Sequence, residues 1–296
     1  MAELRDLTGL LVVITGGARG IGQATAELFL KRGARLALLD LDLGLCEATA
    51  RALTDRGGEA RAYRADVREL ADLVAAADRI EQAQGPIDVW VNNAGIMSLG
   101  AFLEQPEAAD RRQIEVNLLG VIHGMRVVLP RMVARGRGHV VNVASMAGKL
   151  GVPFAATYSA TKHAVVGLTE AVRLEHRGSG VSFSYVMPIP VKTELLAGTQ
   201  PMAWPPPVEP QDVAEAIVHA VQTRQVEVFV PGYQRLLAVL PHLVPRWAVE
   251  WIARLTKFDR FFRNVDPGAR AAYVARTTGP EGAKAEGEAK KVRVVG

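Results

Sequence analysis

The chain has very little cysteine, since Cys46 is the only one among 296 residues. An intrachain disulfide is therefore impossible, and a reducing compartment such as the cytoplasm is expected. We interpret Cys46 itself as a small residue on a helix. The six histidines show no metal-ligand spacing and no cysteine cluster accompanies them, so the sequence predicts no metal site.

Charge of one sign and long apolar runs are also scarce. Lys and Arg number 35 and Asp and Glu 31, a formal excess of +4 that is too small and too scattered to predict nucleic-acid binding. We find no apolar stretch long enough to span a bilayer. The first residues carry acids before an apolar run that leads into glycines, so we expect a first strand there rather than a signal peptide.

Short apolar runs alternate with helical patterns through most of the chain. Predicted strands cover residues 10–14, 35–39, 60–65, 87–91, 139–144, 181–186 and 226–230. The intervening helices are expected at 23–32, 45–56, 69–84, 106–134, 158–177 and 211–223. Strands separated by helices throughout predict an α/β fold, a Rossmann-type doubly wound parallel sheet of about seven strands.

The pattern also predicts how the chain is divided. We expect a nucleotide-binding domain over residues 1–232 and a hydrophobic and basic helical extension over 233–276 packed on it. Residues 277–296 are rich in Gly, Ala, Lys and Glu, a composition typical of a disordered tail.

A glycine-rich turn, TGGARGIG at residues 15–22, lies between the first predicted strand and the first predicted helix. Its backbone N–H groups can approach a pyrophosphate at the positive end of that helix. Asp40 ends the second predicted strand, roughly 20 residues after the turn, where an acid binds a ribose 2′-hydroxyl and repels a 2′-phosphate. These features favour nucleotide binding over a purely structural turn.

A second motif, YSATK at residues 158–162, begins another predicted helix. Residues four apart share a helix face, so the Tyr158 hydroxyl and the Lys162 ammonium are expected on one side. The ammonium is expected to lower the pKa of the phenol into the range useful for acid/base catalysis. Ser145 follows a different strand and can supply a second hydrogen-bond donor. Taken alone, the motif also fits a half-exposed helix face.

Together these segments resemble the short-chain dehydrogenase/reductase family, in family order, over roughly residues 7 to 232. The resemblance is carried by TGGARGIG at 15–22, Asp66-Val67, NNAG at 92–95, Asn117, Ser145 and YSATK at 158–162. It implies a proton-exchanging tyrosine, a lysine that binds the nicotinamide ribose, a serine that hydrogen-bonds the substrate oxygen, and an asparagine that holds a relay water. The catalytic residues implied are Asn117, Ser145, Tyr158 and Lys162.

The resemblance also implies a dinucleotide cofactor. The residues expected to bind it are Gly16, Arg19, Gly20, Ile21, Gly22, Asp40, Asp66, Val67, Asn92, Asn93, Ala94, Gly95, Tyr158, Lys162, Pro188, Val191 and Thr193. Asp40 favours NAD, whereas Arg19 in the glycine turn can accompany NADP, and we weigh Asp40 higher. Ile189 stands where the family usually has glycine. A β-branched residue does not easily take a positive φ, so this loop is expected to use another conformation.

We therefore expect an NAD-dependent oxidoreductase that interconverts a hydrophobic secondary alcohol, such as a steroid, retinoid or lipid, and its ketone. An apolar lining from residues 96–97, 149–154 and 195–210 suggests that substrate class, although the Pro-rich part can simply pack on the domain. The alternatives are an NADPH-dependent carbonyl reductase and a non-catalytic nucleotide-binding scaffold.

The segment from residue 235 to 254 mixes tryptophans and aliphatics with arginines. It can cap the substrate cleft, pack against a second subunit, or lie peripherally on a membrane. The resemblance implies a homodimer or homotetramer formed through the two helices that hold Asn117 and Tyr158.

Overall fold

Seven strands pair in parallel into one sheet with the order β3-β2-β1-β4-β5-β6-β7, which confirms the predicted doubly wound fold. The computed structural model describes residues 4–201, 205–236, 238, 245, 260–263 and 265–277. The strands are β1 Leu11–Thr15, β2 Arg35–Asp40, β3 Ala60–Arg64, β4 Val89–Asn92, β5 Gly138–Val143, β6 Val181–Pro188 and β7 Glu227–Val230. The chain order reverses between β1 and β4, where open sheets of this type bind ligands.

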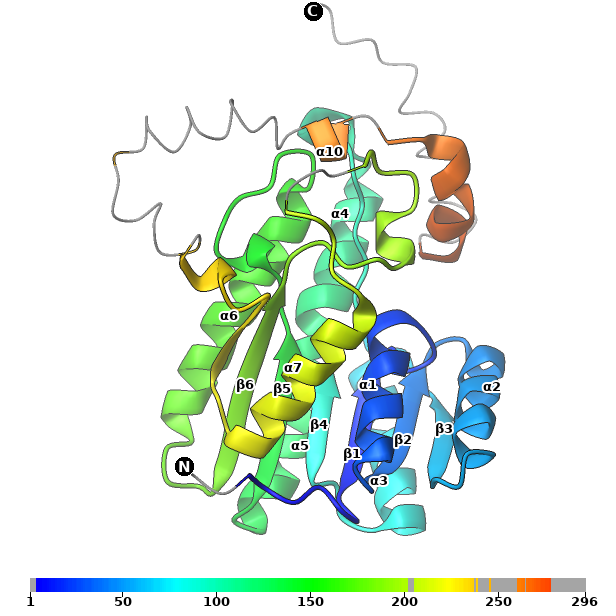
Figure 1. Cartoon of the computed structure of the whole chain (residues 1–296), viewed down its shortest axis with the longest axis vertical. Helices are drawn as coiled ribbons and strands as arrows, with labels where there is room; N and C mark the ends of the chain where they lie inside the picture. Colours follow the sequence, from blue (N-terminus) through cyan, green and yellow to red (C-terminus); the bar gives the residue numbers. More distant parts are fainter. Residues whose placement is uncertain are drawn as a thin grey trace, which may run out of the picture.

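Helices cover both faces of the sheet, as Figure 1 shows. Alternate residues of β1 pack on opposite sides: Leu11 and Val13 contact the α3, α5 and α6 side, and Val12 and Ile14 the α1, α2 and α7 side. Burial on both faces explains why the strands read as continuous apolar runs. The helices are α1 Gly20–Lys31, α2 Leu43–Thr54, α3 Leu70–Gln84, α4 Glu107–Ile114, α5 Gly120–Ala134, α6 Ala156–Glu175, α7 Pro210–Thr223 and α10 Arg260–Arg263.

The predicted helix over residues 106–134 is present but changes its winding. A π-helical segment, η2 (Glu115–Leu119), joins α4 to α5. By length and composition the combined helix Glu107–Ala134 could cross a membrane, contrary to our prediction that no stretch is long enough. Half of its most apolar window is buried inside this fold, where residues such as Val121 and Met125 pack in the core. We therefore interpret it as a core helix.

Three further short helices occur in the described part of the chain: η1 Phe102–Glu104, η3 Met146–Gly148 and η4 Glu194–Leu196. Of the predicted C-terminal extension, α10 and a helix over residues 267–277 are described. Residues 202–204, nearly all of 237–259 and 278–296 lie outside the described residues. The predictions of a membrane-interface segment and a disordered tail fall largely on them, as does a small part of the predicted apolar loop over residues 195–210. Thr277, assigned to that tail, belongs to the helix over residues 267–277.

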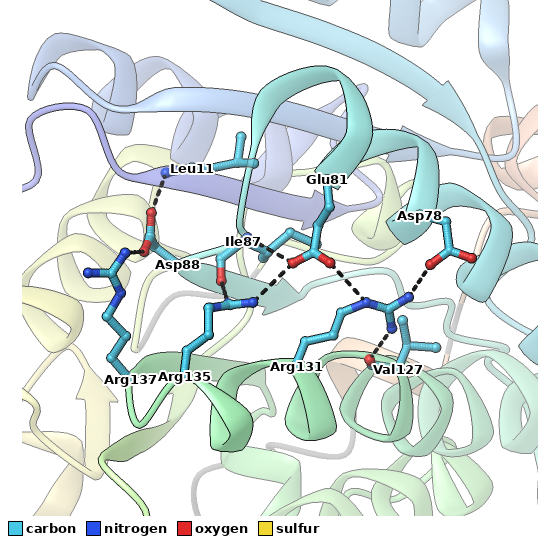
Figure 2. A network of polar contacts seen from close by, with 9 residues as sticks. All are labelled: Leu11, Asp78, Glu81, Ile87, Asp88, Val127, Arg131, Arg135 and Arg137. Atoms are coloured by element: carbon cyan, nitrogen blue, oxygen red, sulfur yellow. Dashed lines mark hydrogen bonds and ion pairs between the residues drawn. The ribbon is translucent and has the colours of Figure 1, made fainter.

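A group of ion pairs fixes α3 against α5 at the end of the sheet away from the glycine turn (Figure 2). Glu81 on α3 accepts hydrogen bonds from Arg131 Nε and Arg135 Nη1, each at 3.1 Å. Its carboxylate also accepts the backbone N–H of Ile87 at 3.3 Å. Arg131 additionally pairs with Asp78. One carboxylate thus joins two helices and the turn before β4.

Replacing Glu81 with alanine is expected to lower the free energy of unfolding by about 1–3 kcal/mol, because two guanidinium groups that are three-quarters buried each lose one of their acceptors. The matched control is Glu107→Ala, which breaks the exposed pair with Arg111. That change should cost no more than about 0.5 kcal/mol. Urea unfolding of both variants measures the difference, and equal costs would contradict the prediction.

Candidate active site

A cavity of about 980 Å³ opens at the carboxyl ends of the strands. It brings together most of the sequence-predicted site residues, from segments far apart in the chain. Those that line it are Gly16, Arg19, Gly20, Ile21, Asp40, Asp66, Val67, Asn93, Ala94, Gly95, Ser145, Tyr158, Lys162, Pro188, Val191 and Thr193. Gly22, Asn92 and Asn117 do not line it.

The glycine turn becomes the N-terminus of α1, which begins at Gly20 rather than at the predicted residue 23. Gly16 and Gly20 have φ values of +62° and +54°, a region that favours glycine. A Cβ on Gly22 would lie 2.1 Å from the Gly16 carbonyl oxygen, so Gly22 allows the turn to close on itself. The first turn of α1 carries no acidic residue. A cradle of this kind fits a pyrophosphate.

The end of β4 holds this turn in place. The Asn93 amide nitrogen donates to the carbonyl oxygens of Thr15 and Gly16, both at 3.0 Å. The Thr15 hydroxyl oxygen accepts the backbone N–H groups of Asn93 and Ala94 at 3.0 and 3.1 Å. The side chain of Asn92 points elsewhere, since it bonds Trp90 and Asn142 inside the fold. The side chain of Asn92 is thus engaged inside the fold, and its assignment to the cofactor stays a prediction.

Three acidic residues, Asp40, Asp42 and Glu194, line the cavity near the glycine turn. Asp40 accepts hydrogen bonds from the backbone N–H groups of Ala18 and Asp42 at 3.2 and 3.1 Å. Arg19, the basic residue that argued for NADP, pairs with Asp42 at 3.1 Å and with Glu194 at 3.4 Å. Its guanidinium charge is therefore already engaged by two acids.

Asp66 lies beyond this rim with its carboxylate held by Arg68. The Arg68 Nε lies 3.0 Å from both carboxylate oxygens. Burial alone would raise the pKa of the Asp66 carboxyl, but the hydrogen bonds and charge of Arg68 outweigh it, and that pKa lies below its ordinary value. Asp66 therefore stays ionised at the cavity wall.

Tyr158 and Lys162 lie one turn apart on α6, with the Lys162 Nζ 5.6 Å from the centre of the Tyr158 ring. Lys162 donates to the Val143 carbonyl oxygen at 2.8 Å, and burial lowers the pKa of its ammonium to about 8. Burial raises the pKa of the Tyr158 phenol to about 12, which hydrogen bonding to Ser145 offsets only in part. The pKa of the phenol therefore lies above its ordinary value and not below it as expected, because burial is the larger effect.

Ser145 caps the short helix η3 after β5, in extended backbone conformation. Its hydroxyl oxygen accepts the backbone N–H of Ala147 at 3.1 Å. The same hydroxyl donates to the Pro188 carbonyl oxygen, with 3.5 Å between the two oxygens. A weak bond of that length leaves the hydroxyl able to turn toward another oxygen in the cavity.

Asn117 is fully buried in the π-helical segment η2. Its amide exchanges two 2.8 Å hydrogen bonds with the backbone of Ile96 and donates to the Thr161 hydroxyl at 3.3 Å. Gly95 separates it from the cavity: a Cβ there would lie 3.4 Å from Asn117 Oδ1 and 3.7 Å from Lys162 Nζ. Asn117 thus lies close to Lys162, behind the cavity wall.

The loop after β6 accommodates Ile189 without a positive φ, as expected, since the non-glycine residues with positive φ in the described chain are Phe154 and Arg224. Ile189 is buried and its N–H donates to the Val230 carbonyl at 3.0 Å. Val191 bridges to Val208, and the Thr193 methyl would lie 3.3 Å from a Cβ on Gly20. The loop therefore still reaches the glycine turn.

Several residues of the C-terminal helices line the same cavity and were not predicted from the sequence. They are Phe262, Tyr273, Arg276 and Thr277. Phe261 and Phe262 form an apolar cluster with Met97, which Tyr158 also contacts. The three-residue spacing from Arg270 through Tyr273 to Arg276 indicates that these residues share one helical face. It does not indicate which part of the fold that face contacts.

Comparison with known proteins finds a match to the family model for short chain dehydrogenase over residues 10–204. Oxidoreductase UcpA of Escherichia coli is 35% identical over 74% of this chain and 82% of its own length. The 17-beta-hydroxysteroid dehydrogenase 13 of Rattus norvegicus is 30% identical over 85% and 84%, and 2-(S)-hydroxypropyl-CoM dehydrogenase 3 of Xanthobacter autotrophicus 40% identical over 60% and 70%.

A solved structure is also similar, that of a short chain dehydrogenase/reductase from Burkholderia phymatum in complex with NAD. It has a TM-score of 0.75 and 30% sequence identity, over 81% of this chain and 95% of that one.

Proposed function

The chain belongs to the short-chain dehydrogenase family, oxidoreductases that act on CH–OH groups with a nicotinamide cofactor, and from this we propose that it interconverts a hydrophobic secondary alcohol and its ketone with NAD. The observation that carries the proposal is one cavity lined by the glycine turn, Ser145, Tyr158 and Lys162 together. A scaffold that only bound nucleotide would have no physical need for the proton-transfer residues Ser145, Tyr158 and Lys162.

We assign the chemistry to side chains at the inner end of the cavity. When bound, the nicotinamide ring supplies or accepts the hydride. Tyr158 takes the proton from the alcohol oxygen during oxidation and returns it during reduction. Ser145 donates to that oxygen, where charge develops. Lys162 holds the nicotinamide ribose and stabilises the phenolate by its charge, and Asn117 positions a relay water beside it.

The preference for NAD over NADP rests on charge at the rim. Asp40 offers its carboxylate to a ribose 2′-hydroxyl and would repel a 2′-phosphate. Arg19, the basic residue in the glycine turn, is paired with Asp42 and Glu194, which lowers its capacity to attract that phosphate. The solved relative in complex with NAD supports the same choice.

The substrate class is inferred from the apolar residues that line the cavity. They include Met97, Leu150, Val152, Leu195, Leu196 and Phe262. Such a lining favours an apolar body attached to the reacting carbon. That one relative is named for hydroxysteroids is consistent with a steroid or similarly bulky lipid-like alcohol.

We further propose a homodimer or homotetramer in the cytoplasm. Exposed apolar side chains on the two long helices support assembly through them: Ile114, Leu119, Val133 and Leu174. The segment proposed for peripheral membrane contact lies mainly outside the described residues.

The direct test is NADH formation from NAD with a panel of steroid, retinoid and long-chain secondary alcohols, followed by the matching ketones with NADH. Turnover of one class establishes the dehydrogenase and its substrate type. A protein that binds NAD but turns over no member of either panel would favour the non-catalytic alternative.

Alcohol oxidation is expected to accelerate as the pH rises, and ketone reduction to slow. Oxidation needs the phenolate of Tyr158, which forms above its pKa, whereas reduction needs the phenol. Burial raises the pKa of the Tyr158 phenol to about 12, so a phenolate at lower pH requires stabilisation by nearby positive charge. Lys162→Met should therefore shift the midpoint for oxidation to higher pH.

Initial rates at saturating NAD, from about pH 6 to pH 10, measure this midpoint. The control is Lys31→Met, which changes an exposed lysine at the end of α1. Profiles of equal midpoint in the parent and Lys162→Met would overturn the assigned role of the ammonium.

A further inference from the structure

One face of the helix over residues 267–277 is turned toward the active site. Tyr273, Arg276 and Thr277 line the cavity, and Arg270 is only 5% exposed. Tyr273 is three residues from both Arg270 and Arg276 and four from Thr277, so these positions share one side of the helix. In Figure 1 this orange-red helix lies at the same end of the molecule as α10, away from the N-terminus.

Arg270 connects two loops that follow different strands. Its Nη1 donates to the carbonyl oxygens of Leu195 and Ala197, both at 2.9 Å. Leu195 lies in the short helix η4, which follows β6, and Ala197 comes directly after it. Its Nη2 donates to the carbonyl oxygen of Met97, in the loop after β4. One planar guanidinium can serve all three oxygens because its donors form a fixed fork.

Tyr273 completes the attachment of Met97. Its hydroxyl oxygen accepts the Met97 backbone N–H at 2.8 Å. The Arg270 guanidinium carbon lies 4.5 Å from the centre of the Tyr273 ring, so each side chain holds the other. Both backbone polar groups of Met97, itself 5% exposed, are therefore paired by this helix, and buried groups of that kind are costly to leave unpaired.

The two loops form the wall around the proposed acid/base. Met97, Leu195 and Leu196 belong to the apolar cluster in which Tyr158 is packed. Tyr273 is also close enough for its phenol to contribute to the raised pKa of Tyr158. A shift in either loop would thus change the wall against which a substrate is oriented.

We propose that Arg270 and Tyr273 are positioning residues that hold the substrate half of the active site assembled before substrate binds. The inference rests on the proposed dehydrogenase function for its kinetic consequence, but not for its structural one. It assigns to the C-terminal helix an effect on substrate affinity that is larger than its effect on cofactor affinity.

Arg270→Ala is expected to raise KM for the alcohol about ten- to hundredfold, since small misplacements of a binding wall have effects of that size, while the Kd for NAD changes by less than about threefold. Arg270→Lys should recover little, because an ammonium lacks the fork. Tyr273→Phe removes only the Met97 bond and should give a smaller rise. The control is Arg51→Ala, on the exposed surface of α2, which should leave both constants unchanged.

Hydrogen exchange provides a measurement independent of turnover. In Arg270→Ala and Arg270→Lys, peptides covering residues 96–99 and 193–199 should exchange faster than in the parent, while peptides of the glycine turn stay protected. Unchanged exchange in the two loops of a folded variant would overturn the proposal, as would a KM rise matched by an equal loss of NAD affinity.

If no alcohol is oxidised even by the parent, the proposed function fails and exchange still decides the role of Arg270. If Arg270→Ala does not fold, Arg270→Lys and Tyr273→Phe decide it.

Discussion

Replacing Tyr158 with phenylalanine is expected to lower kcat for alcohol oxidation by about 10²- to 10⁴-fold, the usual contribution of a general acid/base. The change removes one hydroxyl and keeps the ring that packs in the apolar cluster with Met97 and Phe262. The fold and the glycine turn should therefore be unaffected. NAD binding should weaken little, because most of the proposed cofactor contacts lie on other segments of the cavity.

The matched control is Tyr63→Phe, which removes a hydroxyl bonded to Gln84 from β3, an edge strand of the sheet. It should leave kcat within about twofold of the parent. Measuring kcat, KM and the Kd for NAD on both variants separates a lost proton transfer from a lost fold. A Tyr158→Phe variant that keeps most of its kcat would contradict the acid/base assignment and favour Ser145 or water as the proton donor.

The strands and the glycine turn could be predicted from the sequence because their signals are local. A strand buried on both faces is a run of apolar residues wherever it lies, and residues 10–14 correspond to β1 within one position at each end. The positive φ of Gly16 likewise follows from a turn that only glycine readily forms. The π-helical segment at Asn117 carries no comparable local signal, so one regular helix was predicted there.

The rest depends on contacts between residues far apart in the chain. Arg19 and Glu194 are 175 residues apart in sequence, and their pairing follows only once the loop after β6 reaches the glycine turn. The same holds for Arg270, whose partners are fixed by how the last helix packs. The high pKa of Tyr158 is also a property of burial rather than of the motif, which explains why the motif alone suggested the opposite direction.

The cofactor preference should be reversed most strongly by changing two acids together. Asp40→Asn removes the charge that would repel a 2′-phosphate, yet Arg19 remains engaged by Asp42 and Glu194. Asp42→Asn weakens that engagement and keeps the cap of α2, since Asp42 accepts the Leu45 N–H and asparagine caps helices equally well. Both substitutions change charge with little change in shape.

We expect each single variant to move the ratio of NAD to NADP affinity modestly and the double variant to move it by about 10- to 100-fold, the size of one new charged hydrogen bond. The effects should be more than additive, because Arg19 can reach a phosphate only when both the repulsion and its competing partner are reduced. The control is Asp55→Asn on the exposed end of α2, which should leave the ratio unchanged.

Titration of both cofactors against the parent, the two single variants, the double variant and the control tests this directly. A double variant that behaves like Asp40→Asn would mean that Glu194 alone suffices to hold Arg19. Adding Glu194→Gln to the double variant would then decide whether Arg19 reaches the phosphate at all. If NADP affinity still does not rise above that of Asp40→Asn, the choice between NAD and NADP depends on Asp40 alone. Arg19 would then only stabilise the rim of the cavity.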